Sequence, residues 1–294
     1  MSSSMLRPLT GALPELSFDQ FFADGISAAA VSRETQTLFV ASRSGRLCRL
    51  SPEGERLQEA TGFEDARLLQ VADNGAAGLA VCDDRRLKCF DNQLELWWEA
   101  RVTGRVTAIA AAPYASHFAF ATDGSRIHVV TSERKEVTTI ECRRPIEHLH
   151  FLAERPAIIV ASEYGELSCY SVSGELEWSD GKAGNLGMTA VSEAGNRLII
   201  AAFNHGVQVR DLAGEQLGTF AIDGIPCAVA CSSLRERVLV HTLEGRLFCL
   251  SFSGAVLWVA QLLEQNLNGM FVSAIGNELT LTWESGAMCH YLLH

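Results

Sequence analysis

The residues that could carry chemistry in this 294-residue chain are two histidines one residue apart, His148 and His150. Side chains two apart on a strand point the same way, so both rings face one side. The equivalent positions of other repeats hold Gln70 and Asn268. Because a metal needs three or four converging ligands and amides are poor ones, we expect no metal and interpret the histidines as solvated or hydrogen-bonded. A small-ligand or metal-dependent enzyme site at His148 and His150 remains the alternative.

Other signatures of catalysis are absent from the sequence. It contains no GxSxG elbow, no P-loop, no GxGxxG after a strand, no aspartate-rich calcium loop and no CxxC pair. Nine cysteines, an odd number, favour reduced thiols over a disulfide framework. Positions that alternate Cys with Val along the repeat indicate small core residues, namely Cys89, Val129, Cys169, Val209, Cys249 and Cys289. We therefore expect no cofactor.

Charge and hydropathy exclude several kinds of partner. The formal net charge of −11 argues against nucleic acid and anionic membranes, which require a basic patch. No stretch of 18 apolar residues predicts membrane insertion, and the first residues contain no apolar run of secretory length. The sequence thus predicts a cytoplasmic location and protein partners.

A unit of about 40 residues returns along most of the chain. In its clearest copy, IIVASEYGELSCYSVSGELEW, short apolar runs alternate with two-residue turns, which predicts three strands. The strands that open this unit recur at residues 38–42, 78–82, 118–122, 158–162, 198–202, 238–242 and 278–282. Each is preceded by a further short strand of small or apolar residues, so each copy supplies four strands.

Seven copies of four short strands, with no 3.6-residue period, predict an all-β protein: a seven-bladed β-propeller. The last copy lacks a fourth strand. Residues 14–18 can supply it, because Phe18 occupies the repeat position of Trp98, Trp178 and Trp258. We therefore predict that this N-terminal strand, with Leu16, completes the last blade and closes the ring. The prediction makes residues 14–294 one domain and residues 1–13 a short mobile tail.

The segments GELSCYSVSGELEW, GRLFCLSFSGAVLW and RRLKCFDNQLELWW resemble the PQQ-like or WD40-like propeller repeat. The resemblance covers nearly the whole chain and implies architecture rather than activity, because such propellers include quinone-dependent dehydrogenases and cytosolic scaffolds. The adjacent cysteine pair of those dehydrogenases and the Trp-Asp dipeptide of WD40 repeats are absent.

Turns between the second and third strands share one rim with the connections between blades, and they suggest a binding surface. Acidic residues occupy these turns in copies two to four, and large apolar residues in copies five to seven, where turns are normally polar. The candidate partner-binding residues are Asp83, Asp84, Asp123, Glu163, Tyr164, Phe203, Leu243 and Trp283. We expect a non-enzymatic platform, or a subunit of a larger assembly, whose protein partner brings an apolar anchor and a basic segment.

Overall fold

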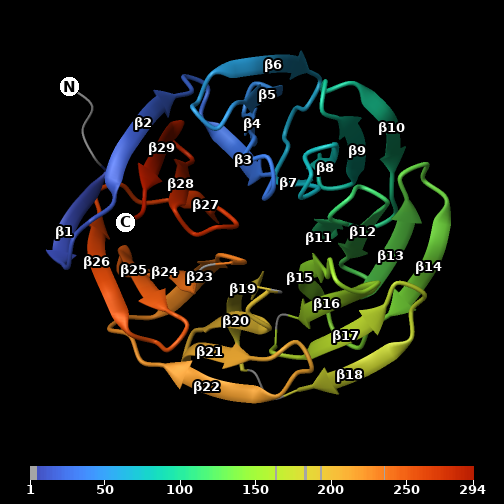
Figure 1. Ribbon diagram of the computed structural model, residues 1–294. Helices are drawn as coiled ribbons and strands as arrows, with labels where there is room; N and C mark the ends of the chain where they lie inside the picture. The colour runs from blue at the N-terminus through green and yellow to red at the C-terminus, as the bar shows by residue number, and fades with distance from the viewer. Residues whose placement is uncertain (1–4, 163, 182–183, 193, 235) are drawn as a thin grey trace.

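The structure, a computed structural model, describes residues 5–162, 164–181, 184–192, 194–234 and 236–294. Within these residues the regular elements are all β-strands, and seven antiparallel sheets surround a central axis (Figure 1). The predicted seven-bladed β-propeller is therefore confirmed.

Strands follow one another from the axis outward in each blade. The first blade comprises β3 (Ile26–Val31), β4 (Leu38–Ser42), β5 (Arg46–Leu50) and β6 (Arg56–Thr61). The second comprises β7 (Leu68–Val71), β8 (Ala77–Cys82), β9 (Arg86–Asp91) and β10 (Leu96–Arg101). The third comprises β11 (Val106–Ala111), β12 (His117–Thr122), β13 (Arg126–Thr131) and β14 (Glu136–Glu141). The fourth comprises β15 (Ile146–Phe151), β16 (Ala157–Ser162), β17 (Leu167–Ser171) and β18 (Leu176–Asp180).

The remaining blades complete the ring. The fifth comprises β19 (Leu186–Ser192), β20 (Arg197–Ala202), β21 (Gly206–Arg210) and β22 (Gln216–Phe220). The sixth comprises β23 (Pro226–Cys231), β24 (Arg237–Thr242), β25 (Arg246–Ser251) and β26 (Val256–Leu262), joined at the outside by β1 (Leu6–Thr10). The seventh comprises β27 (Leu267–Val272), β28 (Glu278–Trp283), β29 (Ala287–Leu292) and β2 (Glu15–Phe21).

Packing between blades explains why the strands are apolar on both faces. Every residue of β8 and β16 is buried, because each of these strands lies between two neighbouring sheets. The resulting core is a ring of clusters between adjacent blades rather than one central mass. Ala28 and Ala30 of β3 are buried near the axis.

Ring closure occurs as the sequence predicted. Strand β2 pairs antiparallel with β29, with Leu16 opposite Tyr291 and Phe18 opposite His290. The Phe18 ring stacks on the His290 ring, with 4.8 Å between centroids. The first and last parts of the chain thus share one sheet, which removes the edge that β29 would otherwise expose.

The predicted tail over residues 1–13 was wrong for Leu6–Thr10. These residues form β1, which pairs with β26 and adds a fifth strand to the sixth blade. Leu6 is buried in the cluster between the sixth and seventh blades. Residues 1–4 lie outside the described part of the chain.

The register expected for the seventh copy was wrong by one residue. In the seventh blade Trp283 pairs with Leu267, the first residue of the inner strand. In the sixth blade the residue in this position is Thr242, which pairs with Pro226 and ends β24. Trp283 therefore ends its strand and does not belong to the turn. The extra residue lies in the connection 263–266. The same shift places His290, not Cys289, at the repeat position of Cys249.

Candidate functional site: one rim and the channel

One rim of the ring is formed by the turns between second and third strands together with the connections between blades, as predicted. Hydrogen bonds join the two kinds of segment. The Asp123 amide donates to the Arg105 carbonyl at 2.8 Å, and the Leu243 amide donates to the Ile225 carbonyl at 2.9 Å. We call this surface the first rim. Among the described residues, bonds of this kind recur at other blades, as from the Phe203 amide to the Asn185 carbonyl at 3.1 Å.

The acidic residues of the second and third blades lie exposed or half-buried on the first rim, but arginines accompany them. Asp84 forms an ion pair with Arg67 and lies 3.7 Å from Nε of Arg105. Asp83 pairs with Arg86 at 2.7 Å. Asp123 is exposed on the same rim. The turns alone suggested an acidic sector, but arginines from β9 and from the connections give these blades mixed charge.

Two predicted residues belong to the fourth blade. Tyr164 is exposed, and the Arg144 guanidinium lies 5.4 Å from the centroid of its ring. This distance fits a cation–π contact, which holds an aromatic face at the rim. Glu163 lies outside the described residues.

An apolar sector does form, on the fifth and sixth blades. Leu243 is 62% exposed, and its neighbour Ile225 is 40% exposed. Phe203 is half-buried, while Leu263, in the next connection, is 58% exposed. We call Phe203, Ile225, Leu243 and Leu263 the apolar sector.

Trp283 does not belong to the apolar sector. It is completely buried, and its Nε1 donates to the Glu264 carbonyl at 3.3 Å. Its assignment as a surface anchor was wrong, because the one-residue shift of the seventh blade turns this position into the core.

Ile225 and Leu263 were missed by the sequence analysis. A signal for Ile225 was present, because the same repeat position holds Gly25, Asp65, Arg105, Pro145 and Asn185 in other copies. A comparison of the connections would have singled out this isoleucine.

Acidic groups of the sixth blade border the apolar sector. The carboxylate of Glu244 accepts hydrogen bonds from the Ile225 amide at 3.0 and 3.3 Å. These backbone hydrogen bonds are the main reason that the pKa of Glu244 is lowered. Asp223, which pairs with Arg246, is 83% exposed at its side chain. The charge beside the apolar sector is therefore negative at neutral pH.

The two histidines of β15 both form hydrogen bonds to the neighbouring fifth blade. Nε2 of His148 donates to the Gly187 carbonyl at 3.0 Å, and Nε2 of His150 lies 2.8 Å from the Thr189 hydroxyl. Both contacts reach the first strand of the fifth blade. Burial lowers the pKa of both rings, to about 3 for His150. The pair therefore joins two blades as neutral, hydrogen-bonded rings.

The other two predicted channel residues lie in different places. Gln70 and His150 line one pocket at the axis, together with Arg33 and Asp73. Asn268 lies elsewhere and links the last blade to the first, because its Nδ2 donates to the Ile26 carbonyl at 2.9 Å. The arginine and aspartate were not singled out by the sequence, because they lie in the turns between the first and second strands of their blades and not in the strands.

Metal-ligating residues do not gather in the part of the chain that the structure describes, where no three His, Cys, Asp or Glu side chains could hold a metal ion together. All nine cysteines are free. Burial raises the pKa of Cys89 to about 12 and that of Cys82 to about 11, so these thiols are protonated and unreactive at neutral pH.

A pH dependence follows from the neutral state of His150. The unfolded chain binds a proton at this ring below its ordinary pKa of 6.5, whereas the folded chain excludes it down to about pH 3. Stability should therefore fall as the pH decreases from 6.5 toward 3. We expect His150→Gln to reduce the loss between pH 7 and pH 5 by on the order of 1–2 kcal/mol. Urea unfolding at both pH values measures this loss.

The control for this measurement is His205→Gln, which changes an exposed histidine on the first rim. The control should lose as much stability as the original protein. Identical losses in the His150→Gln protein and the control would contradict the assignment of a neutral His150.

Comparison with known proteins adds no family to this picture. No protein-family model matches the sequence, and no curated protein matches it. Among the described residues, no helix has the length and apolar character that crossing a membrane requires. The established description of the chain is therefore its architecture, a seven-bladed β-propeller with a first rim that carries an apolar sector.

Proposed function

We propose that this chain is a non-enzymatic platform that binds a partner protein through the apolar sector of the first rim. The observation that carries the proposal is the exposure of Ile225, Leu243 and Leu263 on three neighbouring segments of the first rim. The Leu243 amide hydrogen-bonds the Ile225 carbonyl and so joins the first two of these segments. Large apolar residues on rigid turns are costly to expose to water, and a partner that covers them removes that cost.

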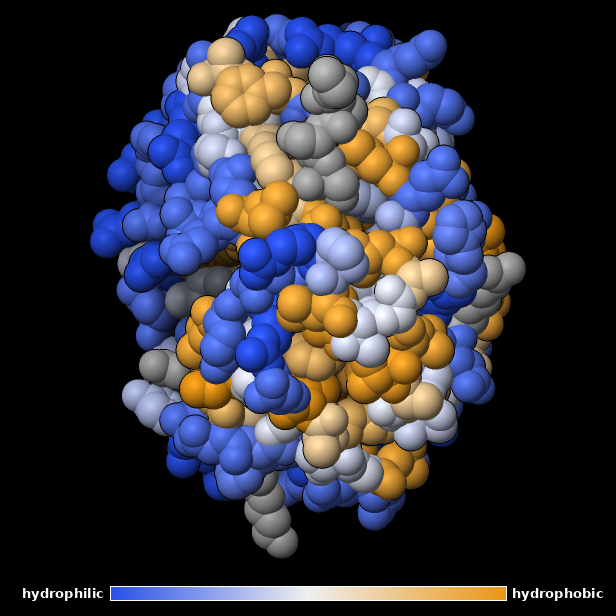
Figure 2. Space-filling model, turned by 90° about the vertical axis from the view of Figure 1, so that its left-hand side faces the viewer, coloured by the Kyte–Doolittle hydropathy of each residue, from blue (hydrophilic) through white to orange (hydrophobic). Residues whose placement is uncertain are grey.

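The surroundings support a particular kind of partner. Apolar surface is also exposed on the side of the molecule that carries β1 and β26 (Figure 2), but its residues Val256 and Leu257 lie at the end of β26 away from the first rim and do not extend the apolar sector. Glu244 adds negative charge next to the sector, whereas Arg246 offsets the charge of Asp223. A partner segment with an aliphatic or aromatic anchor and adjacent basic residues complements both features.

The test is a double substitution, Ile225→Ser with Leu243→Ser, in the full chain. After the partner is identified by co-purification, its affinity for each variant is measured by calorimetry. We expect the double variant to bind at least tenfold more weakly, because central apolar anchors dominate interface energies. Its melting temperature should stay close to that of the original protein, since both side chains are exposed.

Leu217→Ser is the matched control, because Leu217 is a similarly exposed leucine, at 50%, on the outer strand β22. Equal affinity of the double variant and the control would place the interface away from the first rim.

A second function has one observation in its favour, the pocket at the axis that Arg33, Gln70, Asp73 and His150 line. Its polar lining would suit a small polar ligand. A ligand-dependent rise in melting temperature that is lost in Arg33→Ala would favour this function over the first.

A further inference from the structure

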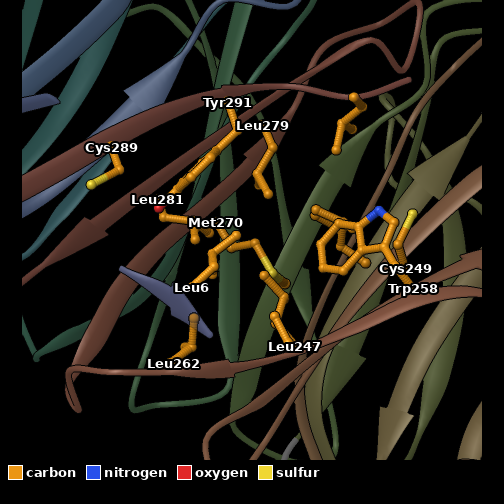
Figure 3. Close-up of a cluster of buried hydrophobic side chains, with 14 of the residues drawn as sticks. Leu6, Leu247, Cys249, Trp258, Leu262, Met270, Leu279, Leu281, Cys289 and Tyr291 are labelled. Atoms are coloured by element: carbon orange, nitrogen blue, oxygen red, sulfur yellow. The ribbon is translucent and has the colours of Figure 1, made fainter. Parts of the chain in front are cut away.

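Strand β1 shows how an extended segment binds to the outside of a blade. It pairs antiparallel with the outer strand β26, with Leu6 opposite Leu262 and Arg7 opposite Gln261. Leu6 enters the cluster between the sixth and seventh blades, where Leu262 and Met270 surround it (Figure 3). The Met5 amide donates to the Tyr291 hydroxyl at 3.2 Å. The strand is thus held by backbone pairing, one buried aliphatic anchor and one tyrosine.

The same arrangement exists three blades earlier without an added strand. Thr138 of β14 pairs with Val129, and the equivalent pair of the sixth blade is Trp258 with Cys249. Cys142 follows Thr138 by four residues and Leu262 follows Trp258 by four, so Cys142 occupies the repeat position of Leu262. Tyr170 pairs with Ile158 as Tyr291 pairs with Leu279. Both binding elements therefore recur: an outer strand, here β14, which ends its sheet among the described strands, and a tyrosine on the next blade.

A surface cavity marks this second position. It is a shallow hollow lined by Cys142, Arg144, Ser162, Glu166 and Tyr170, among others. Ser162 occupies the position that Trp283 fills in the seventh blade, since each pairs with the first residue of its blade's inner strand. The Tyr170 hydroxyl here contacts the Cys142 thiol instead of a backbone amide.

Charges beside the cavity define what the segment must carry. A segment that runs as β1 does would place the residue after its anchor opposite Glu141, which is 76% exposed at its side chain and lies 3.3 Å from Arg126. Residues before the anchor would lie beside Arg143 and Arg144, which are both exposed. The order acidic, aliphatic, basic therefore fits this groove.

We propose that the groove between the third and fourth blades binds an extended segment of a partner protein, which adds a strand to β14 and places an aliphatic anchor over Cys142 and Tyr170. The segment carries an acidic residue before the anchor and a basic residue after it. This surface is separate from the apolar sector, so the proposal goes beyond the proposed function and does not depend on it. The mode is strand addition, in which backbone hydrogen bonds give affinity and one pocket gives specificity.

The chain supplies a suitable probe. A fluorescent peptide with the sequence of residues 1–12 and the change Ser4→Glu carries the required acidic, aliphatic and basic groups. It is titrated against the full chain, whose own β1 occupies the sixth blade. We expect saturable binding in the micromolar range, measured by fluorescence anisotropy.

Two substitutions locate the bound peptide. Tyr170→Phe should weaken binding roughly fivefold by removing one hydrogen-bond acceptor. The matched control is Tyr291→Phe, which alters the docking of the chain's own β1 and should leave peptide affinity unchanged. Glu141→Lys should weaken binding at least tenfold, and a peptide with Arg7→Glu should restore most of the loss on that variant.

Three results would overturn the proposal. The first is the absence of saturable binding. The second is binding that neither Tyr170→Phe nor Glu141→Lys changes. The third is binding that responds to Tyr291→Phe but not to Tyr170→Phe, which would show that the peptide replaces β1 on the sixth blade.

Discussion

Deletion of residues 1–22 should prevent the ring from closing and lead to aggregation. The deletion removes both β1 and β2, leaving the edges of β29 and β26 unpaired. It also removes Phe18, which stacks on His290, and Leu6, which is buried between two blades. We expect loss of the cooperative thermal transition, measured by calorimetry, and elution in the void volume of a sizing column.

Shorter deletions separate the contributions of the two strands. Deletion of residues 1–12 removes β1 alone and should cost about 2–4 kcal/mol, mainly because the buried Leu6 is lost. If residues 1–13 were a mobile tail, as the sequence predicted, this deletion would be nearly neutral. Deletion of residues 1–4 is the control and should leave the melting temperature unchanged. A protein lacking residues 1–22 that melts like the full chain would show that β2 does not close the ring.

Substitution of Trp283 by alanine should cost about 3–5 kcal/mol of unfolding free energy. The indole is completely buried in the cluster between the sixth and seventh blades, and its Nε1 donates to the Glu264 carbonyl. Alanine leaves a cavity and an unsatisfied carbonyl at the connection 263–266. Guanidinium unfolding measures the loss.

The matched control for this experiment is Trp97→Ala, because Trp97 is 45% exposed on the outer strand β10. That change should alter stability by no more than about 0.5 kcal/mol. If both substitutions caused the same loss of unfolding free energy, Trp283 would have to be exposed. That is the position in a surface turn that the sequence predicted.

The repeat of 40 residues was sufficient to predict the strands, the number of blades and the closure of the ring. These features depend on apolar runs, turn residues and the equivalence of Phe18 with Trp98, Trp178 and Trp258, all of which are local or periodic properties of the chain. Leu243 was found in the same way, because a large apolar residue in a two-residue turn is unusual wherever the turn lies.

Strand β1 and the true position of Trp283 could not be read from the sequence. Leu6–Thr10 belongs to no repeat, and its partner β26 lies at the far end of the chain, so only closure of the ring brings the two together. The shift of Trp283 arises from one extra residue in a connection. A one-residue change of register moves a side chain from the turn to the core, although the local sequence looks the same.

Electrostatics at the site was likewise decided by the tertiary structure. Asp84 looks like an unpaired acid in its turn, but Arg67 and Arg105 reach it from connections on either side of the blade. His148 and His150 share a face of one strand, as alternation requires, yet their hydrogen-bond partners belong to the next blade. The periodic pattern determines which way a side chain leaves its own strand. Its partner and its charge state depend on the neighbouring blade, because burial and hydrogen bonding there act between residues far apart in the sequence.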